Sequence, residues 1–236
     1  VNANAKEENG VTLYPYSYGD EGWYNYQPEP YHQGALEVYY WSMDRDDLRR
    51  LPKTGWIGYL EGENPDYPVT ALQAELTVVR QKIEKMRQDT ATPDTRLSDE
   101  PNLINPATLD VLTELMLGGI PTDSLGYPLH CRVRYFDPER RRAGIPEDVA
   151  ALVETMSADD VTLTLVNVNQ VEPRVVVVQG GAYGEHQIES VTISDQIIAV
   201  QNTYVTIHLA PGCGSSMLIK MSRYANQPTC SFPWDR

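Results

Sequence analysis

The second half of the chain is a succession of short segments rich in strand-forming residues, and turn signals separate them at close intervals. No helix of crossover length lies between these segments, and parallel strands would need such crossovers, so the strands are expected to be antiparallel. Their spacing is typical of two packed sheets. Residues 121–236 are therefore predicted to form a β-sandwich of about seven strands: 129–135, 161–168, 174–179, 186–193, 196–200, 204–209 and 217–222.

The first half, residues 1–120, is predicted to combine helices with aromatic-rich loops, which makes the whole chain α+β. Apolar residues recur with helical spacing over residues 33–51, 69–88 and 107–117, and Gly118-Gly119 would end the third helix. A further short helix is expected after Pro146, because Val149, Leu152, Val153 and Met156 would share one face. Prolines and glycines interrupt residues 1–35 and 52–68, which are expected to be irregular loops.

The charge and cysteine pattern excludes several classes of partner and cofactor. The chain carries 33 acidic and 19 basic residues, a net charge of −14, which argues against nucleic acid or an anionic membrane as the main partner. No run of apolar residues reaches the length of a membrane span. The three cysteines lack zinc or thioredoxin spacing, and no motif indicates a metal or other cofactor. The sequence does not decide whether Cys213 and Cys230 form a disulfide. It also leaves the cellular compartment undecided, with a periplasmic or extracellular location favoured.

The aromatic residues are the strongest hint of a binding site. The chain contains 15 Tyr and 4 Trp but 2 Phe, and rings with a polar edge are suited to surfaces that meet water or a ligand. The segment 22–41 holds many of them, with amides that could bind hydroxyl groups and with Glu29 and His32 as candidate acid–base catalysts. Alternatively, these rings pack the loop against neighbouring helices. The predicted ligand-binding residues are Trp23, Tyr24, Asn25, Tyr26, Tyr31 and His32.

Three other groups of residues have both a chemical and a structural interpretation. The basic run Arg140–Arg142 could bind an anion, although such runs more often pair with acidic side chains of the same surface. The pair Glu185-His186 could serve in acid–base or metal chemistry, but it follows a Gly-rich segment that favours a tight turn. The aromatic tail 223–234 is expected to fold back over an open end of the sandwich or onto the helical half.

Several long segments resemble the C-terminal region of large uncharacterised bacterial proteins whose earlier portion is an α/α-toroid. The similarity lies in LHCRVRYFDPERRRAGIPEDVAALVE, in VTLTLVNVNQVEPRVVVVQGGAYGEH and in the closing RYANQPTCSFPW, while WYNYQPEPYHQGALEVYYW looks like the end of such a toroid. Toroids of this type include glycan-active enzymes and the linalool dehydratase-isomerase family. The resemblance implies a hydrolase or lyase whose main catalytic groups lie on an N-terminal domain or a partner chain outside this sequence.

The leading functional hypothesis is the C-terminal portion or a subunit of a larger carbohydrate-processing protein, in which the β-sandwich supports a helical ligand-binding part. One alternative is a dehydratase or isomerase acting on an apolar alcohol that the same rings enclose. Another is a non-catalytic structural or assembly subunit with a Tyr-rich interface, since Tyr and Trp are enriched at protein interfaces. The expected ligand is thus a carbohydrate or a small apolar molecule, and the expected partner is another chain or domain.

Overall fold

The chain has the predicted α+β class, with antiparallel sheets, and its contacts divide it into two compact units. A computed structural model describes residues 2–29, 33–96, 105–121 and 128–236. The first unit is Val1–Pro52 and the second is Lys53–Arg236. The domain boundary expected at residues 120 and 121 stays a prediction, and each unit is described separately below.

The first unit contains a three-stranded sheet where the sequence predicted an irregular loop, and that prediction is wrong. The order is β1-β2-β3, formed by β1 (Lys6–Glu8), β2 (Val11–Gly19) and β3 (Gly22–Gln27). Tyr, Trp, Val and Thr favour strands, and Asn9-Gly10, both with positive φ, make the tight turn between β1 and β2. Pro15 lies opposite Tyr26 of β3, beyond Leu13, the last residue of β2 that pairs with β1, so β2 has a partner on one side only at this position.

Two helices follow where one continuous segment was expected over residues 33–51. Helix α1 spans Gln33–Ser42 and α2 spans Arg45–Leu48. The break lies at Met43, which adopts a left-handed φ of 54°. Asp44 then caps α2, because its carboxylate accepts a hydrogen bond from the backbone N–H of Asp46 at 2.8 Å.

In its described residues, the second unit begins with the helices α3, α4 and α6. Residues 52–68 were expected to be a loop, but they contain helix α3 (Gly55–Leu60). Burial of Trp56 and Ile57 stabilises this short helix between Gly- and Pro-rich flanks. The predicted long helix is confirmed as α4 (Tyr67–Gln88), which has Pro68 in its first turn. Helix α6 (Asp110–Leu117) starts three residues later than predicted and ends, as predicted, at Gly118, whose φ is 56°.

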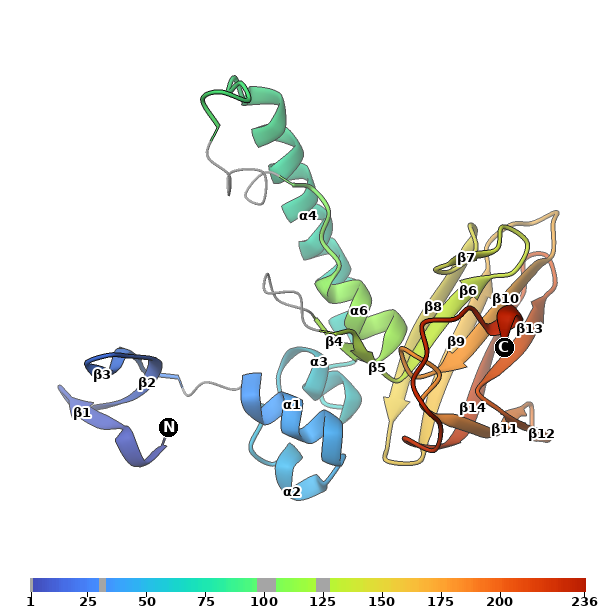
Figure 1. Ribbon diagram of the computed structural model, residues 1–236, viewed down its shortest axis with the longest axis horizontal. Coiled ribbons are helices and arrows are strands. Elements are labelled where there is room, and N and C mark those ends of the chain that lie inside the picture. The colour runs from blue at the N-terminus through green and yellow to red at the C-terminus, as the bar shows by residue number, and fades with distance from the viewer. Residues whose placement is uncertain (1, 30–32, 97–104, 122–127) are drawn as a thin grey trace. The chain divides into compact units, whose positions relative to one another are not determined.

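Two larger antiparallel sheets make up the rest of the second unit, an arrangement consistent with the predicted β-sandwich but with nine strands instead of about seven (Figure 1). The five-stranded sheet has the order β12 (Gln196–Asn202), β11 (Gln187–Ile193), β14 (Gly214–Ser222), β9 (Asp160–Asn167) and β8 (Val149–Met156). The four-stranded sheet has the order β13 (Tyr204–Leu209), β10 (Arg174–Gly180), β6 (Val133–Asp137) and β7 (Arg142–Ala143). A two-stranded ribbon joins β4 (Gly119–Ile120) to β5 (His130–Cys131).

Strand β8 replaces the short helix expected after Pro146. Val149 and Val153 lie four residues apart, a spacing that fits one face of a helix and equally one face of a strand. Both side chains are buried, and β8 pairs with β9 from Val149↔Asn167 to Met156↔Val161. Pairing with a neighbouring strand therefore overrides the local helical pattern, which sequence spacing alone cannot reveal.

The core of the five-stranded sheet follows a strict alternation. In β9 the side chains of Val161, Leu163 and Leu165 are fully buried, and the residues between them are half-buried. The neighbouring strand β14 repeats this pattern with a second set of buried residues: Met217, Ile219 and Met221. Burial of each such side chain stabilises the fold by about 1.5–3 kcal/mol.

Strand β10 is buried on both faces, and the C-terminal tail covers one of them. Val177 lies opposite Phe136 of β6, and the Phe136 ring meets Phe232 at 5.8 Å and Trp234 at 6.1 Å in edge-to-face contacts. Phe232 and Trp234 stack on each other at 5.1 Å. The tail thus lies on the four-stranded sheet, whereas the sequence placed it at an open end or on the helical half.

The last residue fixes this tail to the sheet. The Arg236 guanidinium donates a hydrogen bond to Oε1 of Gln179 at 2.8 Å, and Gln179 is fully buried in β10. The amide of Gln179 also donates to the carbonyls of Gly181 and Ala182. One buried side chain therefore links the tail to the turn that follows β10.

Replacing Trp234 with Ala should lower the free energy of unfolding by about 2 kcal/mol, because a half-buried ring that stacks on Phe232 and contacts Phe136 is lost. Chemical denaturation measures the change. Val171→Ala is the control, since Val171 is 81% exposed and should leave stability within about 0.5 kcal/mol. Equal effects of the two variants would show that the tail does not stabilise the sheet.

Candidate functional site

The sheet of the first unit displays its aromatic side chains on two opposite faces. Register pairs Tyr18 with Trp23 across β2 and β3, and directly opposite residues project to the same side. Their rings meet edge to face at 4.9 Å. By alternation along β2, the same side carries further tyrosines, and we call it the Tyr–Trp face: Tyr14, Tyr16, Tyr18 and Trp23.

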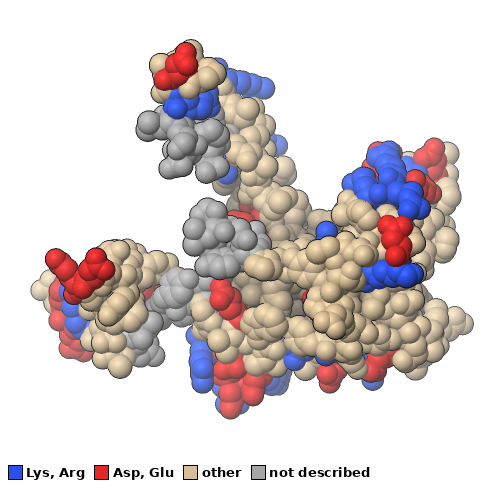
Figure 2. Space-filling view, viewed as in Figure 1, with Lys and Arg blue, Asp and Glu red and all other residues tan. Residues whose placement is uncertain are grey.

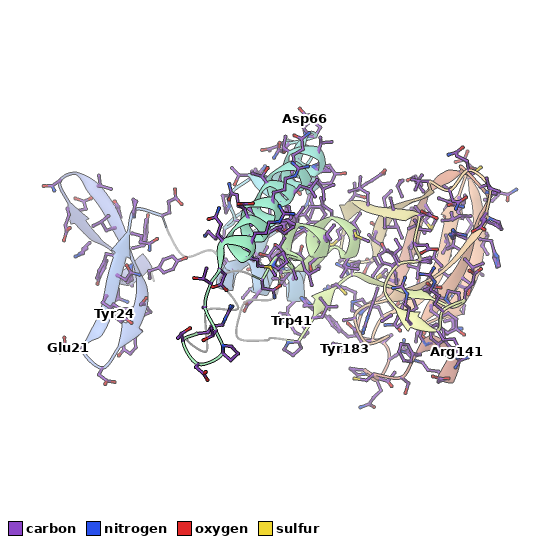
Figure 3. The ribbon with its side chains drawn as sticks, turned by 90° about the horizontal axis from the view of Figure 1, so that it is seen from above. Glu21, Tyr24, Trp41, Asp66, Arg141 and Tyr183 are labelled. Atoms are coloured by element: carbon purple, nitrogen blue, oxygen red, sulfur yellow. The ribbon has the colours of Figure 1, made fainter. Side chains whose placement is uncertain are left out.

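The Tyr–Trp face is open to solvent. Tyr18 is 70% exposed, Tyr16 44% and Trp23 38%. Large rings in such numbers are uncommon on the surface of one small sheet, and clustered exposed apolar groups mark interaction sites. The turn Asp20-Glu21 and the end of β3 at Gln27 supply polar groups near the rings, and Figure 3 labels Glu21 in this turn.

The opposite face of the sheet holds two of the predicted ligand-binding residues. Tyr24 pairs with Ser17 and Tyr26 pairs with Pro15, so both rings point away from the Tyr–Trp face. Tyr24 is 56% exposed and is labelled in Figure 3. Tyr26 is half-buried, and the Lys6 ammonium lies over its ring at 4.2 Å from the centroid.

The predicted binding set is therefore divided. Trp23 lies on one face of the sheet, and Tyr24 and Tyr26 lie on the other. Asn25, between the two tyrosines in the sequence, is exposed and has a left-handed φ of 55°. Tyr31 and His32 lie outside the described residues, and Glu29 is exposed. The acid–base roles assigned to Glu29 and His32 stay predictions.

Glu185-His186, the other candidate pair, supports the turn in which it lies. The Glu185 carboxylate accepts hydrogen bonds from the backbone N–H groups of Ala182 at 3.2 Å and Tyr183 at 2.7 Å. Gly181 is required here, because its φ is 78° and a β-carbon would lie 2.3 Å from the Glu185 carboxyl carbon. Nδ1 of His186 accepts a hydrogen bond from the Tyr224 backbone N–H at 3.2 Å.

A second histidine, the half-buried His130, belongs to the same cluster. Nε2 of His130 lies 3.1 Å from the hydroxyl oxygen of Tyr224. The ring of Tyr224 contacts the His186 ring edge to face, with 4.9 Å between the centroids. Loss of hydration on burial, followed by the nearby Arg132 charge, lowers the pKa of His130 to about 4 and that of His186 to about 3. Both imidazoles are therefore neutral at pH 7 and form part of the packing.

The basic run at 140–142 is paired within the second unit. Arg140 binds Glu147 at 2.6 Å, Arg142 binds Asp137 at 3.3 Å, and Arg141 binds Asp235 at 3.2 Å. Arg141, labelled in Figure 3, also lies over the Trp234 ring of the tail. Figure 2 shows the blue cluster of basic side chains interspersed with red acidic ones, as expected for internal pairing.

The three cysteines form no disulfide with one another in the structure. Cys131, Cys213 and Cys230 are free, so the bridge that the sequence left open between Cys213 and Cys230 is not formed. Within the described ranges, no three His, Cys, Asp or Glu side chains come together in a group that could hold a metal ion. None of the described helices has the length and apolar character needed to cross a bilayer.

The sequence model of a domain of unknown function, DUF8034, matches residues 52–113. This stretch contains α3, α4 and the start of α6, and it includes neither the Tyr–Trp face nor the two large sheets. The comparisons with curated proteins and with solved structures return no match.

His130 and His186 should make the protein less stable in acid. Their folded pKa values lie below the value of about 6.5 for an unfolded histidine, so the unfolded state takes up protons first as the pH falls. The free energy of unfolding should therefore decrease between about pH 6.5 and pH 4, by up to about 1.4 kcal/mol per pH unit for each histidine.

The double variant His130→Gln, His186→Asn keeps a polar partner near each site but does not titrate, so its stability should vary less over that pH range. Denaturation at a series of pH values measures the slope of the free energy of unfolding against pH. Exposed His208, replaced with Gln, is the control and should leave the slope of the wild type unchanged. A double variant with the full wild-type slope would contradict the neutral, buried state of the two imidazoles.

Proposed function

We propose that the chain is the C-terminal portion or a subunit of a carbohydrate-processing protein and that it binds a glycan on the Tyr–Trp face. The observation that carries this proposal is the solvent exposure of Tyr16, Tyr18 and Trp23 on one side of a two-stranded surface. The resemblance of several segments to C-terminal regions that follow an α/α-toroid in large bacterial proteins also supports the proposal.

The chemistry of a sugar ring matches this surface. One face of a pyranose ring presents C–H groups and packs on flat aromatic rings, while its hydroxyl groups project outward to polar partners. Trp23 and Tyr18 would supply the apolar contact, and Gln27 with the Asp20-Glu21 turn would supply hydrogen bonds. Rings displayed along one exposed side of the sheet suit an extended glycan chain that lies along it.

The β-rich part of the second unit would then act as a support. Its groups with catalytic potential make internal contacts: Glu185 holds its own turn, His186 accepts from the Tyr224 backbone, and Arg140–Arg142 pair with carboxylates. Two large antiparallel sheets with a covered outer face form a rigid base, which fits a sandwich that supports a separate ligand-binding part.

The two alternatives differ from this proposal in their ligands. A dehydratase or isomerase would present the same rings to an apolar alcohol, which has no array of hydroxyl groups for Gln27 and the Asp20-Glu21 turn to bind. An assembly subunit would use the Tyr–Trp face as a protein interface and would bind neither ligand.

Replacing Trp23 with Ala should abolish or reduce at least tenfold the affinity for a soluble glycan, because loss of a stacking ring removes a large part of the apolar contact. Isothermal titration with a panel of plant and bacterial polysaccharide fragments measures the affinity, with a terpene alcohol as the comparison ligand. Tyr24→Ala is the matched control, since it removes a ring from the opposite face of the same strand.

A glycan that binds the wild type and Tyr24→Ala but not Trp23→Ala would support the proposal. Binding of the terpene alcohol alone, with the same dependence on Trp23, would favour the dehydratase or isomerase. No binding of either ligand, or equal loss in both variants, would contradict a glycan site on the Tyr–Trp face.

A further inference from the structure

Helix α4 carries a solvent-exposed apolar stripe with heptad spacing. Its members lie alternately three and four residues apart, which places them along one seam of the helix: Val69, Leu72, Leu76, Val79, Ile83 and Met86. Val69 is 61% exposed, Leu76 52% and Met86 47%, whereas Val79 and Ile83 are half-buried. We call these six residues the α4 stripe.

A different side of α4 makes the contacts within the second unit. Tyr67, Ala71 and Glu75 form a row four residues apart, and Ala71 is buried. The Tyr67 hydroxyl donates a hydrogen bond to Glu114 of α6 at 2.6 Å, and Thr108 donates to Glu75. Packing on α6 therefore orients the helix and leaves most of the α4 stripe exposed to water.

We propose that the α4 stripe pairs with the stripe of a second copy of this chain in an antiparallel two-helix coiled coil. A seven-residue repeat sustained over about three heptads is the pattern that such a seam requires. In the antiparallel arrangement Val69 faces Met86 of the partner subunit, Leu72 faces Ile83 of the partner subunit, and Leu76 faces Val79 of the partner subunit. Each layer combines a larger with a smaller or differently branched side chain, which favours close packing.

The charges beside the stripe decide the orientation. In the antiparallel pair, Glu75 lies next to Lys82 of the partner subunit, and symmetry repeats this attraction. Gln73 lies next to Arg80 of the partner subunit, a contact without repulsion. In a parallel pair, Glu75 would meet Arg80 of the partner subunit, but Lys82 would meet Arg87 of the partner subunit, and that repulsion would also occur twice. The second copy is thus complementary in charge only when antiparallel.

The surface along α4 fits this account. A protein with a net charge of −14 repels its own copies in general. Residues 67–88 differ, because Arg80, Lys82, Lys85 and Arg87 outnumber Glu75 and Glu84, so the helix itself does not carry the acidic excess of the whole chain.

Sedimentation equilibrium of the full chain, under reducing conditions because Cys213 and Cys230 are exposed, tests the assembly. The wild type should form a dimer, and Leu76→Glu should be monomeric while its far-ultraviolet circular dichroism stays unchanged. Ala74→Glu is the matched control, since residue 74 is exposed on the outer side of the helix and its replacement should leave the dimer intact.

Lys82→Glu tests the orientation. In the antiparallel dimer it replaces two attractions with two repulsions and should raise the dissociation constant roughly tenfold. In a parallel dimer it would create attractions to Arg87 of the partner subunit and lower the constant. A wild type that stays monomeric, a Leu76→Glu variant that stays dimeric, or tighter association of Lys82→Glu would each overturn the proposal. Glycan binding on the Tyr–Trp face does not enter any of these outcomes.

Discussion

The second unit depends on the burial of β10 on both of its faces. Val176 and Val178 project to one side and Val177 and Gln179 to the other, and all four are nearly or fully inaccessible to water. A strand buried in this way has a continuous apolar sequence, and RVVVVQ is such a run. The tail lies on this second face, where Phe232 and Trp234 contact Phe136 and Arg236 binds Gln179.

This constraint explains why polar groups near β10 serve the fold. Gln179 cannot reach water, so its amide must find partners, and it finds them in the following turn and in Arg236. Glu185 satisfies the backbone donors of the same turn. His186 and His130 are desolvated and remain neutral. Side chains that suggest chemistry in the sequence thus make hydrogen bonds that stabilise the fold.

Much of the β-rich part could be predicted from the sequence because its alternation and turn residues agree. The expected strand at 174–179 matches β10, and the expected strand at 204–209 matches β13. Failures arose where a pattern fits two structures: Val149 and Val153 suit a helix or a strand, and pairing with β9 decided between them. In residues 1–27 the prolines and glycines concealed a sheet that the Asn9-Gly10 turn and the flanking aromatic residues support.

The candidate site was predictable in composition but not in geometry. The abundance of Tyr and Trp pointed to a surface, yet only the register of β2 and β3 separates Trp23 from Tyr24 and adds Tyr16 and Tyr18 to its side. The α4 stripe was visible as helical periodicity, but periodicity does not say whether a face is buried. Which face is buried depends on the side of α4 that contacts α6, and that side carries Tyr67, Ala71 and Glu75.

We propose that ligands bind to the Tyr–Trp face and that the β-rich part supports it. Hydrogen–deuterium exchange along the whole chain, with and without a saturating soluble glycan, tests this division directly. With the glycan bound, exchange should be slower in peptides of β2 and β3 and unchanged in peptides of β6 to β14. Protection confined to the β6–β14 peptides, with none in β2 and β3, would contradict it.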